Sequence, residues 1–316
     1  MFKKFKMLVL STMLIGAVGL AGCSANTEEK ESKRVTLVLD LGGVNDESFN
    51  QSAWTGAEQA AKELGVKVRY LESNKEADYE SNIETAIDMG SDLIIGVGFN
   101  LTEAIEKAAN AYPEQQFAIV DGSFEKIPSN VANVVFNEKE AGYLAGLATA
   151  KTIKSDKFGF VGGFEVPAVI NYRDGFEKGL KEINPKATLS VQYANSFTDA
   201  AKGRAIAEQM TKNGISCIMA ASGGVNNGIY EVCAEKDAHA VAVDMAQSYI
   251  LPNTILTSAI KKVDVGVAET IKSYVNGSLK SGTASIYNIA NNGVGYEETK
   301  LISKDVIDFI NNKITK

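Results

Sequence analysis

The chain has 316 residues with a formal net charge of −7, and 45% of its residues are hydrophobic while 22% are charged. This composition is typical of a soluble globular protein long enough for two lobes, and the acidic balance argues against a nucleic-acid partner. A single histidine, His239, has no Cys or His near it at metal-ligand spacing, so the sequence predicts neither a zinc site nor a histidine-based triad.

The N-terminus has the pattern of an export signal, in which a lysine-rich start precedes an apolar stretch too short for a membrane span. The stretch ends in Leu-Ala-Gly-Cys at 20–23, which resembles the lipobox of bacterial lipoprotein signal peptides. That resemblance implies that Cys23 carries the lipid. We expect a signal peptide at 1–22, a flexible tether at 23–34, and a lipid anchor on the extracytoplasmic face of the cell membrane. The alternatives are an ordinary cleaved signal peptide and an N-terminal anchor helix.

Apolar runs and amphipathic helical patterns alternate along the rest of the chain. Strands are predicted at 35–41, 66–71, 93–98, 117–121, 158–162, 189–193, 215–221, 240–244 and 255–259. Helices are predicted at 51–64, 79–89, 101–111, 140–153, 169–183, 200–213, 226–235 and 263–276. Strands that are apolar on both faces, separated by amphipathic helices, are typical of a parallel sheet covered on both sides. We therefore expect an α/β fold.

The strand–helix pattern restarts after Lys139, which predicts two doubly wound lobes of similar size. We expect the first lobe to comprise 35–138 and about 258–285, and the second 139–257 and about 286–316. In open parallel sheets, ligands bind beyond the carboxyl ends of the strands. A ligand would then lie in the cleft between the lobes, contacting residues that directly follow strands.

The loop after the first predicted strand is the richest in polar side chains. It brings together Asp40, Asn45, Ser48, Phe49 and Asn50 just before a helix opens. Such a loop can present acceptors, donors and a ring face to a small polar ligand. The alternative is that one polar residue caps the helix and Phe49 belongs to the core. A cap needs only one residue, so the surplus favours a binding site.

Other predicted strands end in similar residues. We include Gly98, Asp121, Phe164, Gly223 and Asp244 among the candidate ligand contacts. A glycine-rich strand end is often only a turn, but the recurrence in both halves favours a shared site. Neither a G-x-G-x-x-G fingerprint nor a phosphate-binding loop is present, so no nucleotide cofactor is expected.

Residues 40–56 read D-L-G-G-V-N-D-E-S-F-N-Q-S-A-W-T-G, which resembles the opening signature of the basic membrane protein family. These are lipoprotein receptors of the purine nucleoside receptor A type, the substrate-binding parts of ABC importers. Further matches lie at 197–199, 202–203, 256–259, 261–264 and 293–295. The resemblance implies a type I periplasmic-binding-protein fold, in which three crossovers form a hinge and the lobes close over one ligand.

The resemblance also implies roles for particular residues. In the family the base lies between two phenylalanines, which correspond here to Phe49 and Phe197. The carboxylates that meet the base and the ribose correspond to Asp40, Asp121 and Asp244. A family lysine near the ribose falls at Lys261 or Lys262, and spacing leaves both open.

The expected function is therefore that of a lipid-anchored binding protein of an ABC importer, which binds a purine nucleoside and delivers it to the permease. Its expected partners are the nucleoside, the permease and the membrane. The nearest alternative is a receptor of the same fold for a sugar or another small polar ligand. A nucleoside-processing enzyme is a rival from another class, since Asp40 and Asp46 could do acid–base work. The third alternative is a surface lipoprotein with a purely structural role.

Overall fold

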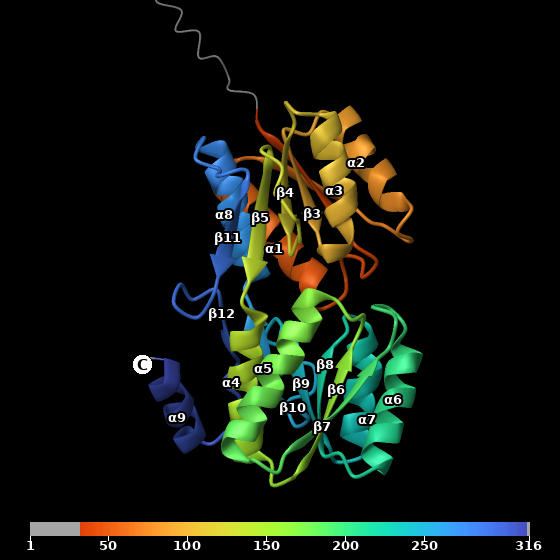
Figure 1. The fold of residues 1–316 in the computed structure, drawn as a ribbon, viewed down its shortest axis with the longest axis vertical. Coiled ribbons are helices and arrows are strands. Elements are labelled where there is room, and N and C mark those ends of the chain that lie inside the picture. The colour runs from red at the N-terminus through yellow and green to blue at the C-terminus, as the bar shows by residue number, and fades with distance from the viewer. Residues whose placement is uncertain (1–31, 315–316) are drawn as a thin grey trace, which may run out of the picture. The chain divides into compact units, whose positions relative to one another are not determined.

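The structure, a computed structural model, describes residues 32–314. The predicted signal peptide at 1–22 and the predicted lipid attachment at Cys23 lie outside the described residues, as does the predicted tether up to residue 31. The described part contains two sheets of six strands each, and helices cover both (Figure 1). The expected α/β fold with two doubly wound lobes is confirmed.

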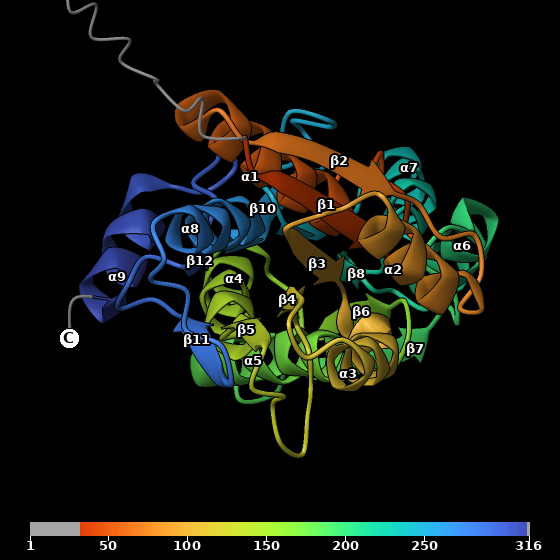
Figure 2. The ribbon, with the colours of Figure 1, turned by 90° about the horizontal axis from the view of Figure 1, so that it is seen from above.

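The first sheet has the strand order β11-β5-β4-β3-β1-β2, and all its pairs are parallel. Its strands are β1 (Arg34–Leu39), β2 (Lys67–Leu71), β3 (Leu93–Val97), β4 (Gln116–Val120), β5 (Val131–Phe136) and β11 (Thr283–Tyr287). Its helices are α1 (Phe49–Leu64), α2 (Asp78–Asp88), α3 (Thr102–Ala111) and α8 (Val263–Val275), with a short 3₁₀ turn at Phe99–Leu101. Figure 2 shows α1 and α8 on one face of this sheet and α2 and α3 on the other. Both faces are therefore covered, which explains why its central strands read as continuous apolar runs.

The second sheet repeats this order as β12-β10-β9-β8-β6-β7, with only the short β12 antiparallel to its neighbour. Its strands are β6 (Lys157–Gly162), β7 (Thr188–Tyr193), β8 (Cys217–Ala221), β9 (His239–Asp244), β10 (Ile255–Lys261) and β12 (Val294–Tyr296). Its helices are α4 (Glu138–Thr152), α5 (Pro167–Ile183), α6 (Ala200–Lys212), α7 (Val225–Glu235) and α9 (Lys304–Ile314). Because the two orders match strand by strand, β4 and β9 occupy equivalent places in their sheets.

Strand β5 is absent from the sequence-based expectations. Its apolar run is interrupted by the polar Asn133. In the structure Asn133 is buried and its side-chain amide donates to the Gly122 carbonyl at 2.8 Å. A tertiary hydrogen bond therefore lets a polar residue occupy a central strand position.

The chain passes between the sheets three times: after β5, after β10, and between β11 and β12. The crossovers lie side by side, because the Asn137 amide donates to the Tyr287 carbonyl and the Lys262 amide donates to Gly293. The Tyr287 ring also stacks on Phe136 with centroids 5.1 Å apart. The second crossover follows Lys261, beyond the boundary expected near 258, because β10 stays in the second sheet throughout its length.

Helices α4 and α5 approach closely through facing glycines. A Cβ at Gly142 or Gly146 would lie 2.4 Å from a carbonyl oxygen of α5, and one at Gly175 would lie 2.1 Å from a carbonyl of α4. Only glycine lets the two backbones come this near. The contact fixes the first turn of α4 against α5, and both contribute residues near the site described below.

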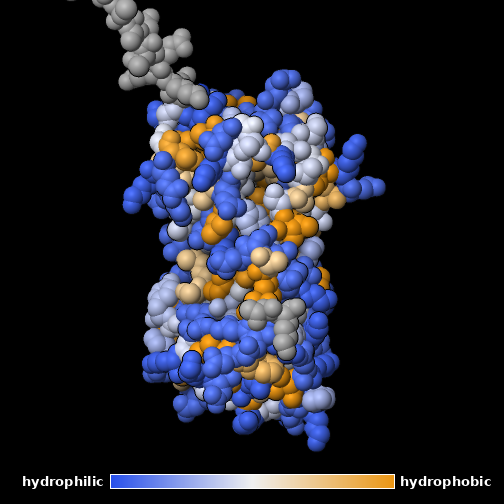
Figure 3. Space-filling model, turned by 90° about the vertical axis from the view of Figure 1, so that its left-hand side faces the viewer, coloured by the Kyte–Doolittle hydropathy of each residue, from blue (hydrophilic) through white to orange (hydrophobic). Residues whose placement is uncertain are grey.

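Within residues 32–314, no helix has the length and apolar character that a membrane crossing requires. Figure 3 shows one face of the molecule, on which hydrophobic side chains form separate patches within a mostly hydrophilic surface.

Candidate functional site

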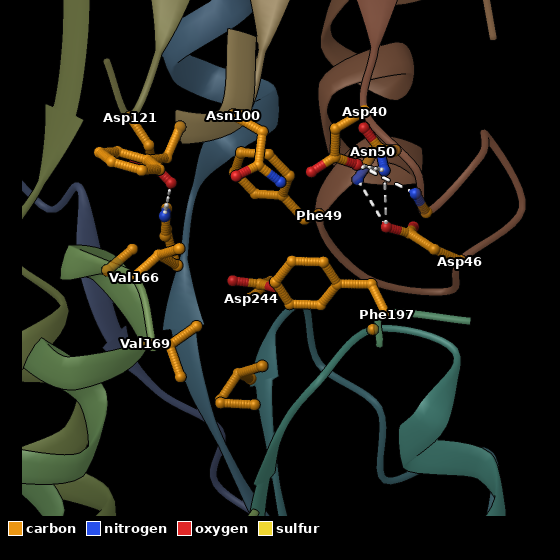
Figure 4. Close-up of a pocket in the computed structure, with 18 of the residues that line it drawn as sticks. Asp40, Asp46, Phe49, Asn50, Asn100, Asp121, Val166, Val169, Phe197 and Asp244 are labelled. Carbon is orange, nitrogen blue, oxygen red and sulfur yellow. Dashed lines mark hydrogen bonds and ion pairs between the residues drawn. The ribbon is translucent and has the colours of Figure 1, made fainter. Parts of the chain in front are cut away.

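A cavity of about 660 Å³, which includes space open to solvent, lies where the carboxyl ends of the two sheets face each other (Figure 4). From the first lobe it is lined by Asp40, Gly42, Asp46, Phe49, Asn50, Gly98, Phe99, Asn100 and Asp121. From the second lobe it is lined by Val166, Ala168, Val169, Tyr172, Phe197, Ala221, Gly223, Val243, Asp244 and Lys261.

Asp46 organises the loop that follows β1. Its carboxylate accepts hydrogen bonds from the backbone amides of Ser48, Asn50 and Gln51 at 2.9–3.0 Å. The amides of Asn50 and Gln51 belong to the first turn of α1 and have no partner within the helix. Burial raises the pKa of Asp46 to about 6, although these hydrogen bonds oppose the shift. Asp46 thus caps α1 and sets the position of the neighbouring Asn50.

Asn50 links Asp46 to Asp40 at one end of the cavity. Its side-chain amide nitrogen donates to Asp40 Oδ1 at 2.8 Å and to Asp46 Oδ2 at 3.2 Å, which fixes its orientation. Burial raises the pKa of Asp40, and the bonds from Asn50 and Gly42 oppose the shift. Gly98 has φ +115°, and a Cβ there would lie 2.8 Å from Asp40 Oδ2. A glycine is needed at 98 for the strand end to approach this carboxylate.

Two phenylalanine rings face the cavity from opposite lobes. Phe49 begins α1, whereas Phe197 lies in the loop before α6, and Figure 4 shows open space between the two rings. Two glycines make room for Phe197. A Cβ at Gly163 would lie 2.1 Å from the Phe197 ring, and Gly223, with φ +58°, lies beside the Phe197 carbonyl. A flat ligand between the rings would have an aromatic face on each side.

The two lobes present equivalent carboxylates. Asp121 follows β4 and Asp244 ends β9, the equivalent strand of the second sheet. Both have left-handed backbones, with φ of 62° and 67° respectively. Such φ values are uncommon outside glycine and concentrate at functional sites. Both residues line the cavity.

Asp244 joins the lobes directly. The Ser48 hydroxyl of the first lobe donates to Asp244 Oδ2 at 2.5 Å, and the Tyr172 hydroxyl of α5 donates to Oδ1 at 3.1 Å. Burial raises the pKa of Asp244, while the nearby Lys261 ammonium opposes the shift. A carboxylate has further lone pairs, so Asp244 retains acceptor capacity toward the cavity.

Lys261, at the end of β10, is the cation of the site. Its ammonium pairs with Asp121 and, at 2.9 Å, with Glu138, the first residue of α4. It also lies 4.9 Å from the centroid of the Phe49 ring. Burial alone would lower the pKa of Lys261, but the Asp121 and Glu138 carboxylates outweigh it and raise the pKa above its usual value. Lys261 is therefore charged and held in place.

Residues 33–316 match the family described as ABC transporter substrate-binding protein, PnrA-like. The chain belongs to this family. It is 33% identical over 347 residues to a protein of Lactococcus lactis named ABC transporter nucleoside-binding protein BmpA, covering 99% of each chain. It is 35% identical over 340 residues to a Listeria monocytogenes protein named CD4+ T-cell-stimulating antigen, covering 97% of this chain and 94% of the relative.

Among solved structures, an ABC transporter solute-binding protein from Aeropyrum pernix resembles this chain with a TM-score of 0.83 and 28% identity, covering 90% of each chain. The resemblance to the basic membrane protein family is thus confirmed. The PnrA-like family consists of substrate-binding proteins of transporters, not enzymes. The acid–base role considered for Asp40 and Asp46 is therefore not supported.

Most residues singled out from the sequence of this PnrA-like protein meet at the cavity. Those that line it are Asp40, Phe49, Asn50, Gly98, Asp121, Phe197, Gly223, Asp244 and Lys261. Four others do not line it: Asn45 is exposed, Ser48 is buried against Asp244, Phe164 packs edge-on to Phe197, and Lys262 follows Lys261 outside the cavity lining.

Several residues that line or support the site are absent from the sequence-based expectations. Asn100 follows β3, and Figure 4 shows it extending toward the cavity near Phe49. Its position just after a predicted strand could have marked it as a candidate ligand contact, because the other candidates also follow strands. Val169 and Tyr172 lie in the first turns of a predicted helix, where an amphipathic pattern gives no sign of a ligand.

Proposed function

We propose that this protein binds a purine nucleoside in the cleft and delivers it to the permease of an ABC importer. The observation that carries the proposal is the pair of rings, Phe49 and Phe197, which face each other across the cavity from different lobes. A nucleobase is flat on both faces, and each base–aromatic stack contributes about 1–3 kcal/mol. The name of the Lactococcus relative supports a nucleoside ligand.

The charges of the lining favour a neutral ligand rich in hydrogen-bond donors. Four carboxyl groups line the cavity, those of Asp40, Asp46, Asp121 and Asp244, and Lys261 is the one lysine or arginine among the lining residues. The Lys261 ammonium is already paired with two carboxylates, those of Asp121 and Glu138. A phosphate group would add negative charge here, whereas ribose hydroxyls and base N–H groups donate to carboxylates at about 1.5–3 kcal/mol each.

A first test compares ligands by thermal unfolding. We expect inosine, guanosine or adenosine to raise the melting temperature of the purified full-length chain, because a ligand that binds only the folded state stabilises it by about 2.7 kcal/mol at 100 times its dissociation constant. Ribose and the corresponding 5′-monophosphates should cause little change. Stabilisation by free sugars alone would instead favour the sugar-receptor alternative.

We propose further that the two lobes move about the three crossovers and close on the ligand. The Ser48–Asp244 hydrogen bond supports this, because it joins a residue of the first lobe to one of the second at 2.5 Å. Closure would also bring Phe49 and Phe197 onto the two faces of the base. A closed form that differs from the open one gives the permease a surface by which to recognise the loaded protein.

We also propose that a lipid on Cys23 anchors the protein to the outer face of the cell membrane. The Leu-Ala-Gly-Cys sequence at 20–23 supports the proposal. Cys23→Ser should move the protein from the membrane fraction into the medium or periplasm while nucleoside binding stays unchanged, as judged by cell fractionation and a thermal-shift assay. Retention of the variant in salt-washed membranes would contradict lipid attachment at this residue.

A further inference from the structure

Three charged side chains are buried together at the hinge. Lys261, Glu138 and Asp121 are 2%, 3% and 8% exposed, and the lysine ammonium contacts both carboxylates. Burial of charge is tolerated when partners compensate it. Here one cation meets two anions, so the cluster has one carboxylate more than neutrality requires.

Glu138 supports the cluster from outside the cavity. It follows the first crossover as the first residue of α4, its Oε1 accepts from Lys261, and its Oε2 accepts from Asn171 of α5 at 3.2 Å. Glu138 is not among the residues that line the cavity. Glu138 can therefore affect a ligand through Lys261, whose ammonium it holds in place at the end of β10.

Asp121 is left with one oxygen uncommitted. Its Oδ2 accepts from Lys261, whereas its Oδ1 is buried and has no hydrogen-bond partner. Asp121 lines the cavity, and its backbone adopts the strained φ of 62° described above. Buried polar atoms without partners are rare in folded proteins and call for an explanation. A hydrogen-bond donor from the ligand is the partner that this place in the cavity offers.

We propose that Glu138 is a positioning residue of the site, which shares the Lys261 ammonium with Asp121. One oxygen of Asp121 then stays available to a hydrogen-bond donor of the ligand. Ligand binding at this oxygen is thereby linked to release of a proton. The proposal rests on the nucleoside-binding function proposed above and adds a regulation of that site by pH. Before binding, Asp121 carries a proton in part of the population. The ligand donates a hydrogen bond from an O–H or N–H group, and the proton of Asp121 passes to the solvent buffer.

The groups around Asp121 set the direction of the effect. Burial raises its pKa to about 7, Lys261 on β10 opposes this, and the charges of Glu138 on α4 and Asp244 on β9 add to it. The Tyr172 hydroxyl on α5 also lies in its electrostatic surroundings and stays neutral. A donor ligand prefers the ionised carboxylate, so affinity rises as pH rises toward about 7 and levels off above it.

Calorimetric titration of the purified full-length chain with inosine tests the proposal, in buffers from about pH 5.5 to about pH 8.5. Below the midpoint the affinity should rise by up to about 10-fold per pH unit, and buffers of different ionisation enthalpy should reveal release of up to about one proton. Glu138→Gln removes a negative charge near Asp121 and should move the midpoint down by about one pH unit. Asp121→Asn should abolish this pH dependence.

Glu140→Gln is the matched control, because Glu140 also lies in the first turn of α4 but accepts from the Ile289 amide, away from the cavity. It should leave the midpoint unchanged. If Glu138→Gln changes affinity equally at every pH, or if the pH dependence survives in Asp121→Asn, the proposal is wrong and another group such as Asp46 titrates.

The proposed function itself fails in a different way. If the wild-type chain shows no heat with inosine, guanosine or adenosine at any pH, nucleoside binding is rejected. A wild-type chain that binds inosine with the same affinity across this pH range keeps the proposed function and overturns the proton linkage alone.

Discussion

Lys261→Met is expected to lower the free energy of unfolding by about 3–5 kcal/mol near pH 8, since removing one partner of a buried ion pair leaves uncompensated charge. Asp121 and Glu138, at 8% and 3% exposure, would then face each other without the ammonium. Methionine fills much of the space of the lysine stem, so the loss reflects charge more than packing.

The loss should depend on pH in a defined direction. Without Lys261 the pKa of Asp121 rises further in the folded state, while in the unfolded state it keeps its ordinary value. The folded variant then binds more protons than the unfolded chain between these values, so its stability falls as pH rises. Urea unfolding of wild type and variant at about pH 5 and about pH 8 measures this, and the difference should be smaller at the lower pH.

Lys262→Met is the matched control, because this half-buried residue is next in the chain and lies outside the cavity lining. Its effect should stay within about 0.5 kcal/mol at both pH values, as is usual for substitutions away from buried features. Equal effects of the two substitutions, or a loss for Lys261→Met that grows on acidification, would contradict the role assigned to the buried cluster.

The sequence predicts the fold well because its signal is local. The alternation of apolar runs with amphipathic helices follows directly from burial of both sheet faces, and the rule that ligands bind at the carboxyl ends of strands then locates Asp121 and Asp244. Strand β5 was missed because its buried Asn133 depends on the Gly122 carbonyl for a partner. A single-sequence pattern contains no record of such a contact.

The supporting residues of the site could not be predicted, because their roles depend on residues distant in the chain. Glu138 lies in a charged stretch typical of an exposed helix start, but it is buried with partners distant in the chain, Lys261, 123 residues away, and Asn171. Ser48 fits a helix cap equally well, yet its hydroxyl donates to Asp244, 196 residues away. Choosing between Lys261 and Lys262 likewise required knowing where β10 ends.

Phe197→Ala is expected to weaken inosine binding by about 1–3 kcal/mol, the contribution of one stacking face, with little change in the stability of the ligand-free fold. The ring is only partly buried and lies against the cavity, between Gly163 and Gly223. A phenylalanine of the core would behave in the opposite way, since its truncation costs about 3–5 kcal/mol of folding free energy. Calorimetric titration and urea unfolding on the same variant separate the two cases.

Phe49→Ala should weaken binding by about as much as Phe197→Ala, about 1–3 kcal/mol, because each ring supplies one of the two stacking faces. Phe164→Ala is the control for both: its ring packs against the edge of Phe197 with centroids 5.2 Å apart but does not line the cavity. It should change the affinity for inosine less than either. If Phe164→Ala weakens binding as much as Phe197→Ala while Phe49→Ala has no effect, the base does not lie between the two lobes, and the stacking arrangement proposed for this cleft is wrong.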